Sequence, residues 1–183
     1  MYTEFTTERL QLRPTLEDDA ELIYQLMNTD KFIKYVGDRG INSIPMAADY
    51  IKRMMLPQLK ALGFSSYTII TKQEGVKIGT CGLYNRDGIA GIDIGFGLLP
   101  GFEGLGYAYE ASHRILNAAF DEFKLNEVKA ITSKENFSSQ KLLEKLGLQK
   151  VGITKLPSSD EEILLYTLAA NKRRIAQKDE SLN

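Results

Sequence analysis

The sequence has little of what several functional classes require. Its 183 residues include one cysteine, Cys81, and one histidine, His113. A single cysteine cannot form an intrachain disulfide, which favours a reducing compartment. A single histidine argues against a histidine-based metal site, so we expect no metal. We expect Cys81, which lies in a predicted strand, to be a buried small hydrophobic residue rather than a nucleophile.

Long apolar runs and an excess of one charge are also missing. No apolar segment approaches the roughly 20 residues that span a bilayer, and the first nine residues do not resemble a secretory signal. The net charge of -1 lacks the basic excess that is typical of nucleic-acid binders. These absences predict a soluble, cytoplasmic protein that binds neither nucleic acid nor membrane.

Hydrophobic residues make up 43% of the chain, enough for a globular domain with its own core. We expect one domain over residues 1–170 and a charged tail over 171–183, although two packed halves also fit this length. Periodicity and turn residues predict strands and helices in an α+β order. The expected strands are 9–13, 64–71, 76–83, 91–99, 128–133, 148–154 and 163–168. The expected helices are 16–27, one that starts after Ser43 and is kinked or broken at Pro57 before Gly63, 106–123 and 137–146. Residues 29–43 are expected to begin as a loop.

A glycine-rich segment, Gly101–Gly106, joins a predicted strand to a predicted helix. The first amides of a helix lack partners and carry partial positive charge, and glycines let the backbone close around a phosphate. The segment is therefore a candidate pyrophosphate cradle, although a plain connecting turn fits the spacing equally well. Tyr107 and Ala108 stand where a Walker A loop needs lysine and Ser/Thr, and no third glycine completes a dinucleotide fingerprint.

The run Asp93–Ala111, D-I-G-F-G-L-L-P-G-F-E-G-L-G-Y-A-Y-E-A, resembles the central motif of the GNAT acetyltransferases. It is most similar to the branch that acetylates the N-termini of ribosomal proteins (RimJ/RimL-like). Glu8–Arg13 resembles that branch's opening T-E-R-L-x-L-R. Glu135–Ser139 and Leu143–Leu148 resemble its E-N-x-x-S and L-E-K-L-G-F. The resemblance covers nearly the whole chain, about Thr7 to Leu168.

This resemblance implies a mixed, mostly antiparallel twisted sheet of about seven strands with about four helices packed on it. It implies an acyltransferase whose acetyl-CoA lies along the strand Asp93–Leu99. Backbone amides of Leu98 and Leu99 would contact the thioester region, and one amide near Leu98 would hold the developing oxyanion. Asn136 would contact the pantetheine arm, which is compatible with helix capping. The residues expected around the pyrophosphate are Glu103, Gly104, Leu105, Gly106, Tyr107 and Ala108.

The catalytic candidates are Asp93 and Ser139. An α-amino group has a pKa near 8, so roughly a tenth of it is neutral at physiological pH and the base has modest work. Asp93 stands where relatives often have glutamate, and its shorter side chain favours a water relay; a structural role at the start of the strand stays open. Ser139 would donate a hydrogen bond to the leaving thiolate. The chain departs from the family at Gly101, where relatives have Gln or Arg, and at Leu143, near which many relatives have a tyrosine acid.

Together these features predict transfer of an acetyl group from acetyl-CoA to a primary amine by direct attack. The acceptor is a peptide or protein N-terminus or a small amine, and residues 29–44 and 156–162 are expected to border its cleft. The alternative is a non-catalytic acyl-CoA-binding module with the same fold. A nucleotide-dependent phosphotransferase is disfavoured by the missing lysine and Ser/Thr. Either a monomer or a homodimer is consistent with the sequence.

Overall fold

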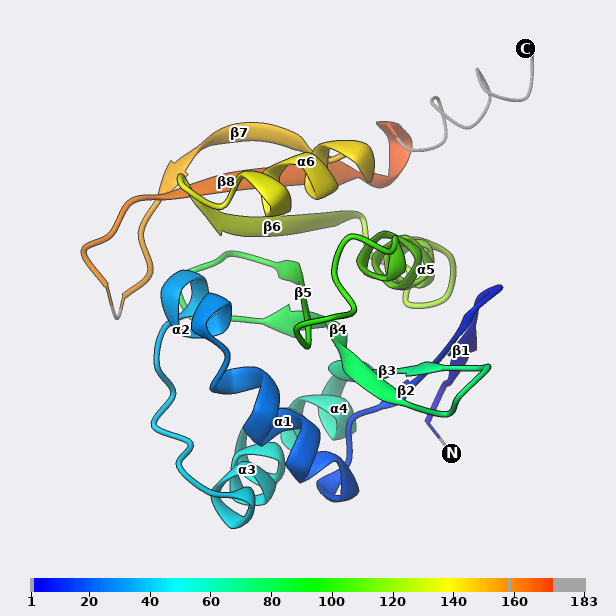
Figure 1. Ribbon diagram of the computed structural model, residues 1–183. Coiled ribbons are helices and arrows are strands. Elements are labelled where there is room, and N and C mark those ends of the chain that lie inside the picture. The colour runs from blue at the N-terminus through cyan, green and yellow to red at the C-terminus, as the bar shows by residue number, and fades with distance from the viewer. Residues whose placement is uncertain (1, 158, 173–183) are drawn as a thin grey trace. The chain divides into compact units, whose positions relative to one another are not determined.

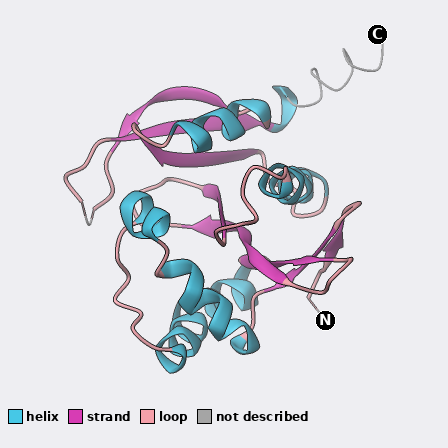
Figure 2. Cartoon of the chain, viewed as in Figure 1, coloured by secondary structure: helices cyan, strands magenta, loops and turns pink. Residues whose placement is uncertain are grey.

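The computed structural model describes residues 2–157 and 159–172, so the predicted tail lies outside the described residues from residue 173 on. The chain divides into two compact units. The first unit comprises the residues up to Tyr84 together with Gly95–Ile115, and the second comprises Asn85–Ile94 and the residues from Leu116 on. Two elements belong to both units, strand β5 (Ile92–Leu98) and helix α5 (Tyr107–Asp121). Figures 1 and 2 show the elements.

The first unit is built on antiparallel strands. Strands β1 (Phe5–Thr6), β2 (Leu10–Pro14), β3 (Ser66–Thr71) and β4 (Lys77–Asn85) pair in that order. The alternation that predicted β2 is confirmed, because Leu10 and Leu12 are fully buried while Gln11 and Arg13, which follow each of them, are half-buried. The end of β5 joins β4, since the Leu99 amide donates to the Ile78 carbonyl at 2.8 Å.

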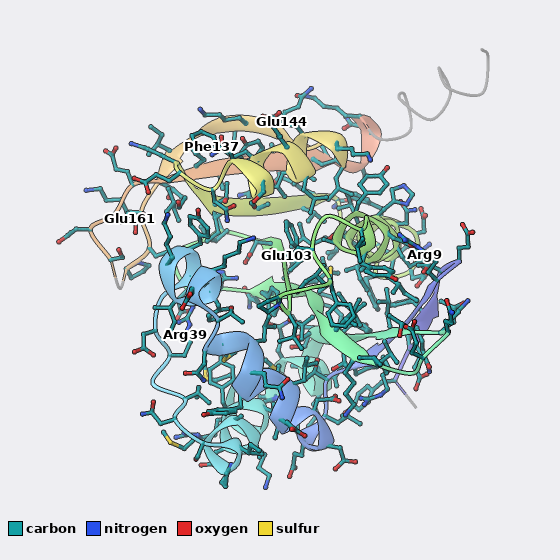
Figure 3. All side chains as sticks on the ribbon, in the orientation of Figure 1. Arg9, Arg39, Glu103, Phe137, Glu144 and Glu161 are labelled. Atoms are coloured by element: carbon teal, nitrogen blue, oxygen red, sulfur yellow. The ribbon has the colours of Figure 1, made fainter. Side chains whose placement is uncertain are left out.

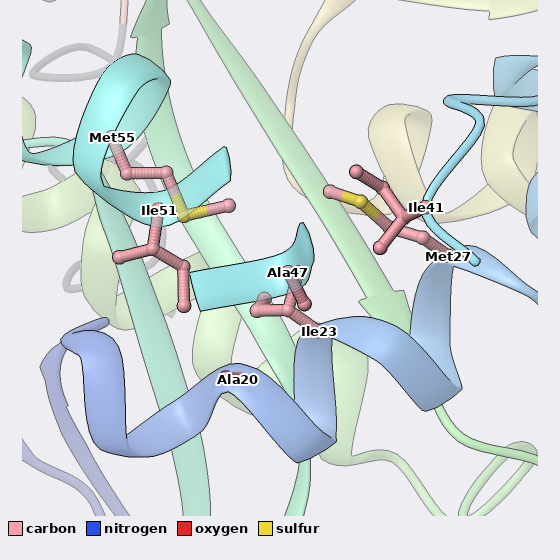
Figure 4. Packing of buried hydrophobic residues seen from close by; sticks show 7 residues of the cluster. All are labelled: Ala20, Ile23, Met27, Ile41, Ala47, Ile51 and Met55. Carbon is pink, nitrogen blue, oxygen red and sulfur yellow. The ribbon is translucent and has the colours of Figure 1, made fainter. Parts of the chain in front are cut away.

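Helices of the first unit enclose an apolar cluster. A 3₁₀ turn (Glu17–Asp19) leads into α1 (Ala20–Met27), which packs on α3 (Ile44–Tyr50). Figure 4 shows how the apolar side chains of these helices and of the following turn meet. The buried members of the cluster are Ala20, Ile23, Met27, Ile41, Ala47, Ile51 and Met55.

The helix predicted after Ser43 is confirmed, and its kink has a specific form. The Ser43 hydroxyl accepts a hydrogen bond from the Met46 amide at 3.3 Å, which caps α3. A π-helical turn, Ile51–Met55, separates α3 from α4 (Leu56–Leu62). Pro57 explains it, because proline has no amide hydrogen and its ring clashes with the carbonyl four residues earlier. Gly63, at φ 80°, ends α4 as predicted.

The prediction that the chain begins a loop at residue 29 is wrong, because Asp30–Val36 forms helix α2. The Thr29 hydroxyl accepts from the Phe32 amide at 3.3 Å, and Gly37 at φ 101° ends the helix. No α2 residue is buried. Because periodicity detects a helix through its buried stripe, that signal is absent here, and only the capping threonine marked it.

The second unit continues the sheet from the start of β5. Strand β6 (Glu127–Ser133) runs parallel to β5, with Lys129 opposite Asp93, and pairs antiparallel with β8 (Ile163–Ala169). Strand β7 (Gln149–Thr154) pairs with β8, and helix α6 (Phe137–Lys145) connects β6 to β7. Through the shared strand the order is β1-β2-β3-β4-β5-β6-β8-β7. The α+β prediction is confirmed, with eight described strands because β1 was not anticipated.

Candidate active site

The glycine-rich loop lies in the first unit and has the backbone that its glycines predict. Gly101, Gly104 and Gly106 have φ of 92°, 73° and 84°, a region that side chains with a Cβ rarely adopt. The Gly106 carbonyl accepts from the Glu110 amide at 3.0 Å, so Gly106 caps α5. The first amides of such a helix have no intrahelical acceptor, and the positive end of its dipole lies there. This terminus suits an anion.

Two carboxylates beside this loop already have partners. Glu110, in the first turn of α5, accepts hydrogen bonds from the Thr7 hydroxyl at 2.5 Å and from the Arg9 amide at 2.8 Å. Burial raises the pKa of Glu110, but these bonds and the Arg9 guanidinium outweigh it and hold the pKa below its ordinary value. Glu103, which lies within the loop and is labelled in Figure 3, forms an exposed ion pair with Lys31 of α2. Neither carboxylate is therefore arranged as a proton acceptor.

Strand β5 approaches β4 very closely before the loop. A Cβ on Gly79 of β4 would lie 2.1 Å from the Gly97 carbonyl oxygen, so only glycine fits there. The Leu99 amide is engaged by Ile78, which corrects the expectation that this amide contacts the thioester. Successive residues of a strand direct their backbone groups to opposite edges. The Leu98 amide therefore faces away from β4, and both leucines are half-buried.

Asp93, in the second unit, is 1% exposed. Arg86 of the preceding turn holds both carboxylate oxygens, with Nε 3.1 Å from Oδ1 and Nη2 3.1 Å from Oδ2. Burial raises the pKa of the Asp93 carboxyl, while the charge and hydrogen bonds of Arg86 oppose that rise. The prediction that Asp93 acts as a base stays a prediction, but its surroundings are now defined. Both carboxylate oxygens of Asp93 already accept hydrogen bonds from Arg86.

Asn136 and Ser139 occupy the first turn of α6 in the second unit. The Asn136 side-chain oxygen accepts from the Ser139 amide at 3.2 Å and from the Ser138 hydroxyl at 3.0 Å, so the capping role is confirmed. Because the side-chain oxygen is used for capping, a contact with pantetheine would use the side-chain nitrogen of Asn136. Ser139 is half-buried, and its proposed contact with a thiolate stays a prediction.

The second segment expected to border an acceptor, residues 156–162, is mainly exposed and includes residue 158, which lies outside the described residues. Pro157 packs on the turn before β5, where a Cβ on Gly88 would lie 2.3 Å from the proline Cδ. Glu162 forms an ion pair with Lys134 at 2.6 Å. The described acidic residues Asp160 and Glu161 are exposed, as a solvated turn would be.

Other candidates are accounted for by their surroundings. Cys81 is fully buried, and burial raises the pKa of its thiol to about 12, so it is no nucleophile. His113 is exposed and stacks on Tyr109, as expected for a residue off the apolar stripe. Within residues 2–157 and 159–172, no three Cys, His, Asp or Glu side chains gather as a metal site would require. The helices of this described part lack the length and apolar character that a membrane crossing needs.

The family model for the acetyltransferase (GNAT) domain matches residues 9–149. The chain belongs to the GNAT acetyltransferase family. It is 33% identical over 149 residues to an uncharacterized N-acetyltransferase, p20, from Bacillus licheniformis, covering 80% of this chain and 83% of that protein. This GNAT protein is therefore an acetyltransferase, and the family predicted from the sequence is confirmed.

Solved structures agree on the GNAT fold. An acetyltransferase from Agrobacterium tumefaciens str. C58 has a TM-score of 0.78 and 25% identity, covering 92% of this chain and 95% of its own. RimL, a ribosomal L7/L12 α-N-protein acetyltransferase solved with coenzyme A, has a TM-score of 0.77 and 14% identity, covering 91% and 98%. The ribosomal-protein acetyltransferases are thus among the structural neighbours of this GNAT chain.

Two arginines were not assigned roles from the sequence. Arg86 gave no signal, because its turn, Asn85–Gly88, reads as an ordinary connection. Arg9 was part of the opening motif, but a motif does not show what a side chain contacts. The structure places Arg86 on Asp93, and it places Arg9 beside the glycine-rich loop, where it contacts the Leu105 carbonyl and Glu110.

Proposed function

We propose that this GNAT acetyltransferase transfers an acetyl group from acetyl-CoA to a primary amine. The observation that carries the proposal is the loop Gly101–Gly106, which follows β5 directly and ends as the N-cap of α5. A pyrophosphate is the anion that such a row of amides suits. The coenzyme A in the RimL structure supports the same cofactor, although at 14% identity that structure shows only the fold.

In this proposal the cofactor contacts are mainly backbone amides. The Leu98 amide faces away from β4. It would pair with pantetheine, which lies along β5 like an added strand, and it would stabilise the thioester oxyanion. Leu99 lies beside the thioester in this proposal, but its amide is used by the Ile78 carbonyl and does not contact the cofactor. Asn136 contacts the pantetheine arm through its side-chain nitrogen. The pyrophosphate contacts are assigned to Glu103, Gly104, Leu105, Gly106, Tyr107 and Ala108, and no metal takes part.

The reaction is direct attack. The neutral amine forms a C–N bond with the thioester carbonyl carbon, and the C–S bond then breaks to release coenzyme A as a thiolate. The ammonium proton passes through water to Asp93, whose ionised form Arg86 supports. Ser139 donates a hydrogen bond to the thiolate. A thiol pKa near 8.5 makes the thiolate a tolerable leaving group, so no strong acid is needed and the leucine at position 143 is acceptable.

Binding of acetyl-CoA tests the cofactor assignment. Gly104 has φ 73° and nothing within 4 Å of an added Cβ, so Gly104→Val strains the loop without a steric clash. We expect calorimetry to show saturable binding to the wild type and at least a roughly tenfold loss in the variant, because the loop amides move. Gly75→Val is the matched control, since Gly75 has φ 68° and open space in an exposed turn. Its affinity should equal that of the wild type.

A thiol-release assay separates the enzyme from the non-catalytic alternative. The protein is mixed with acetyl-CoA and a panel of peptides and small amines, and free coenzyme A is measured with a thiol reagent. The buried Cys81 should contribute little background. Release with at least one amine supports the transferase. Saturable binding without release from any amine would favour the acyl-CoA-binding module, and no binding at all would overturn the cofactor assignment.

A further inference from the structure

Arg9 lies against the glycine-rich loop, although the proposed reaction gives it no role. Its Nη1 donates to the Leu105 carbonyl at 2.9 Å, and its guanidinium carbon lies 4.4 Å from the centre of the Tyr107 ring. A Cβ on Gly106, between these two residues, would lie 3.2 Å from Arg9 Nη2. Arg9 therefore contacts Leu105 of the loop and Tyr107, the first residue of α5, and lies close to Gly106 between them. All of these contacts lie within the first unit.

The side chain of Arg9 is itself held in place by Glu110. Its Nε donates to Glu110 Oε2 at 2.6 Å, and its backbone amide donates to Oε1 of the same carboxylate at 2.8 Å. The Thr7 hydroxyl bonds that carboxylate too and accepts from the Leu10 amide at 3.0 Å. The turn between β1 and β2 is thus fixed to the first turn of α5. Because Glu110 neutralises the Arg9 charge, the guanidinium is better placed to shape the loop than to bind a phosphate directly.

The geometry of a peptide bond turns this contact into a consequence for binding. In a trans peptide the carbonyl of one residue and the amide hydrogen of the next point in opposite directions. While Arg9 holds the Leu105 carbonyl, the Gly106 amide must point away from Arg9. Gly106, at φ 84°, is a glycine and so has little intrinsic bias against other orientations. Without Arg9, this hydrogen bond no longer fixes the peptide plane between Leu105 and Gly106, and the Gly106 amide can turn with that plane.

We propose that Arg9 is a positioning residue that, by holding the Leu105 carbonyl, aims the Gly106 amide at the pyrophosphate of the cofactor. This inference rests on the proposed function, which places the pyrophosphate at this loop. It assigns to the E-R-L-Q-L-R segment a role in cofactor affinity that is separate from the chemical step. If this is correct, substitution of Arg9 should weaken the binding of ligands that carry the pyrophosphate and leave the binding of ligands without it unchanged.

The test compares three ligands by calorimetry, with displacement of coenzyme A for weak binders. Coenzyme A has a pyrophosphate and a 3′-phosphate, dephospho-CoA has only the pyrophosphate, and pantetheine has neither. For Arg9→Ala we expect about a tenfold loss of affinity for both coenzyme A and dephospho-CoA, with pantetheine unchanged. Arg9→Lys should recover only part of the affinity, because one ammonium cannot match the forked contact with Leu105 and Glu110. Arg53→Ala, on an exposed arginine of the same unit, is the matched control.

Each other outcome overturns the inference in a recognisable way. A loss confined to coenzyme A would make Arg9 a ligand of the 3′-phosphate instead. An equal loss for all three ligands, with a lowered melting temperature, would make Arg9 a support of the fold alone. Unchanged affinity for every ligand would show that the loop keeps its shape without Arg9. Wild-type protein that binds none of the three would remove the proposed function and this inference together.

Discussion

Two buried aspartates in different units are held in contrasting ways. Asp19, in the first unit, is fully buried and accepts bonds from Arg13, Lys77, Thr68 and the Leu16 amide. Burial raises the pKa of Asp19, but these donors outweigh it and the pKa lies below its ordinary value. Asp93, in the second unit, is almost as buried and is held by Arg86, yet the pKa of its carboxyl is raised by burial.

The contrast shows that burial alone does not decide what a carboxylate does. A carboxylate surrounded by charged and neutral donors is locked in its ionised form and serves the fold. A carboxylate with a raised pKa keeps more affinity for a proton, which is what a base near a reacting amine needs. The sequence presents the same residue type twice, and the surrounding donors separate a structural role from a candidate catalytic one.

The largest effect we expect comes from Asp19→Asn. The change removes the charge that Arg13 and Lys77 share, so the free energy of unfolding should fall by about 3 kcal/mol, as when a buried pair loses one partner. Denaturant unfolding measures it, with exposed Asp18→Asn as the control. Activity per folded molecule should stay near that of the wild type. A loss below about 0.5 kcal/mol, which is typical of surface substitutions, would show that the network is not structural.

A smaller and different effect is expected from Asp93→Asn. We expect kcat to fall about 100-fold if Asp93 receives the proton. The loss of stability should be smaller than at Asp19, because Asp93 pairs with Arg86, whereas Asp19 pairs with both Arg13 and Lys77. Activity of the wild type should decrease as the pH falls through the raised pKa of Asp93, and the variant should lack that limb. The pH profile of kcat/KM measures this, with Asp87→Asn in the same turn as the control. An unchanged profile with lowered stability would assign both aspartates to the fold.

The smallest expected effect is the pH dependence of the Asp19 contribution. Since the folded pKa lies below the ordinary value of 3.8, Asp19 stabilises the fold above that value and loses its contribution as the pH falls through the folded pKa. The gap in unfolding free energy between wild type and Asp19→Asn should therefore be constant near neutral pH and shrink as the pH falls below about 4. Unfolding curves across this range check the sign. A gap that widens on acidification would contradict the assignment.

Much of the fold and of the site could be predicted from the sequence because the signals are local. Alternation gave β2, the serine cap and Gly63 bounded the second predicted helix, and the glycine motif located the N-cap of α5. Helix α2 was missed because it buries no residue. The role of the Leu99 amide was predicted incorrectly, since which edge of β5 faces β4 depends on the close approach of Gly79 to Gly97.

The sequence by itself predicted the family, seven of the eight described strands and the segment that we propose receives a pyrophosphate. Only the tertiary structure decided the long-range partners: Thr68 and Lys77 on Asp19, and Arg9 on the Leu105 carbonyl. The physical reason is separation along the chain. Periodicity, caps and turns act over a few residues, whereas Arg9 and Glu110 are 101 positions apart and meet only because the folded sheet and helix bring them together.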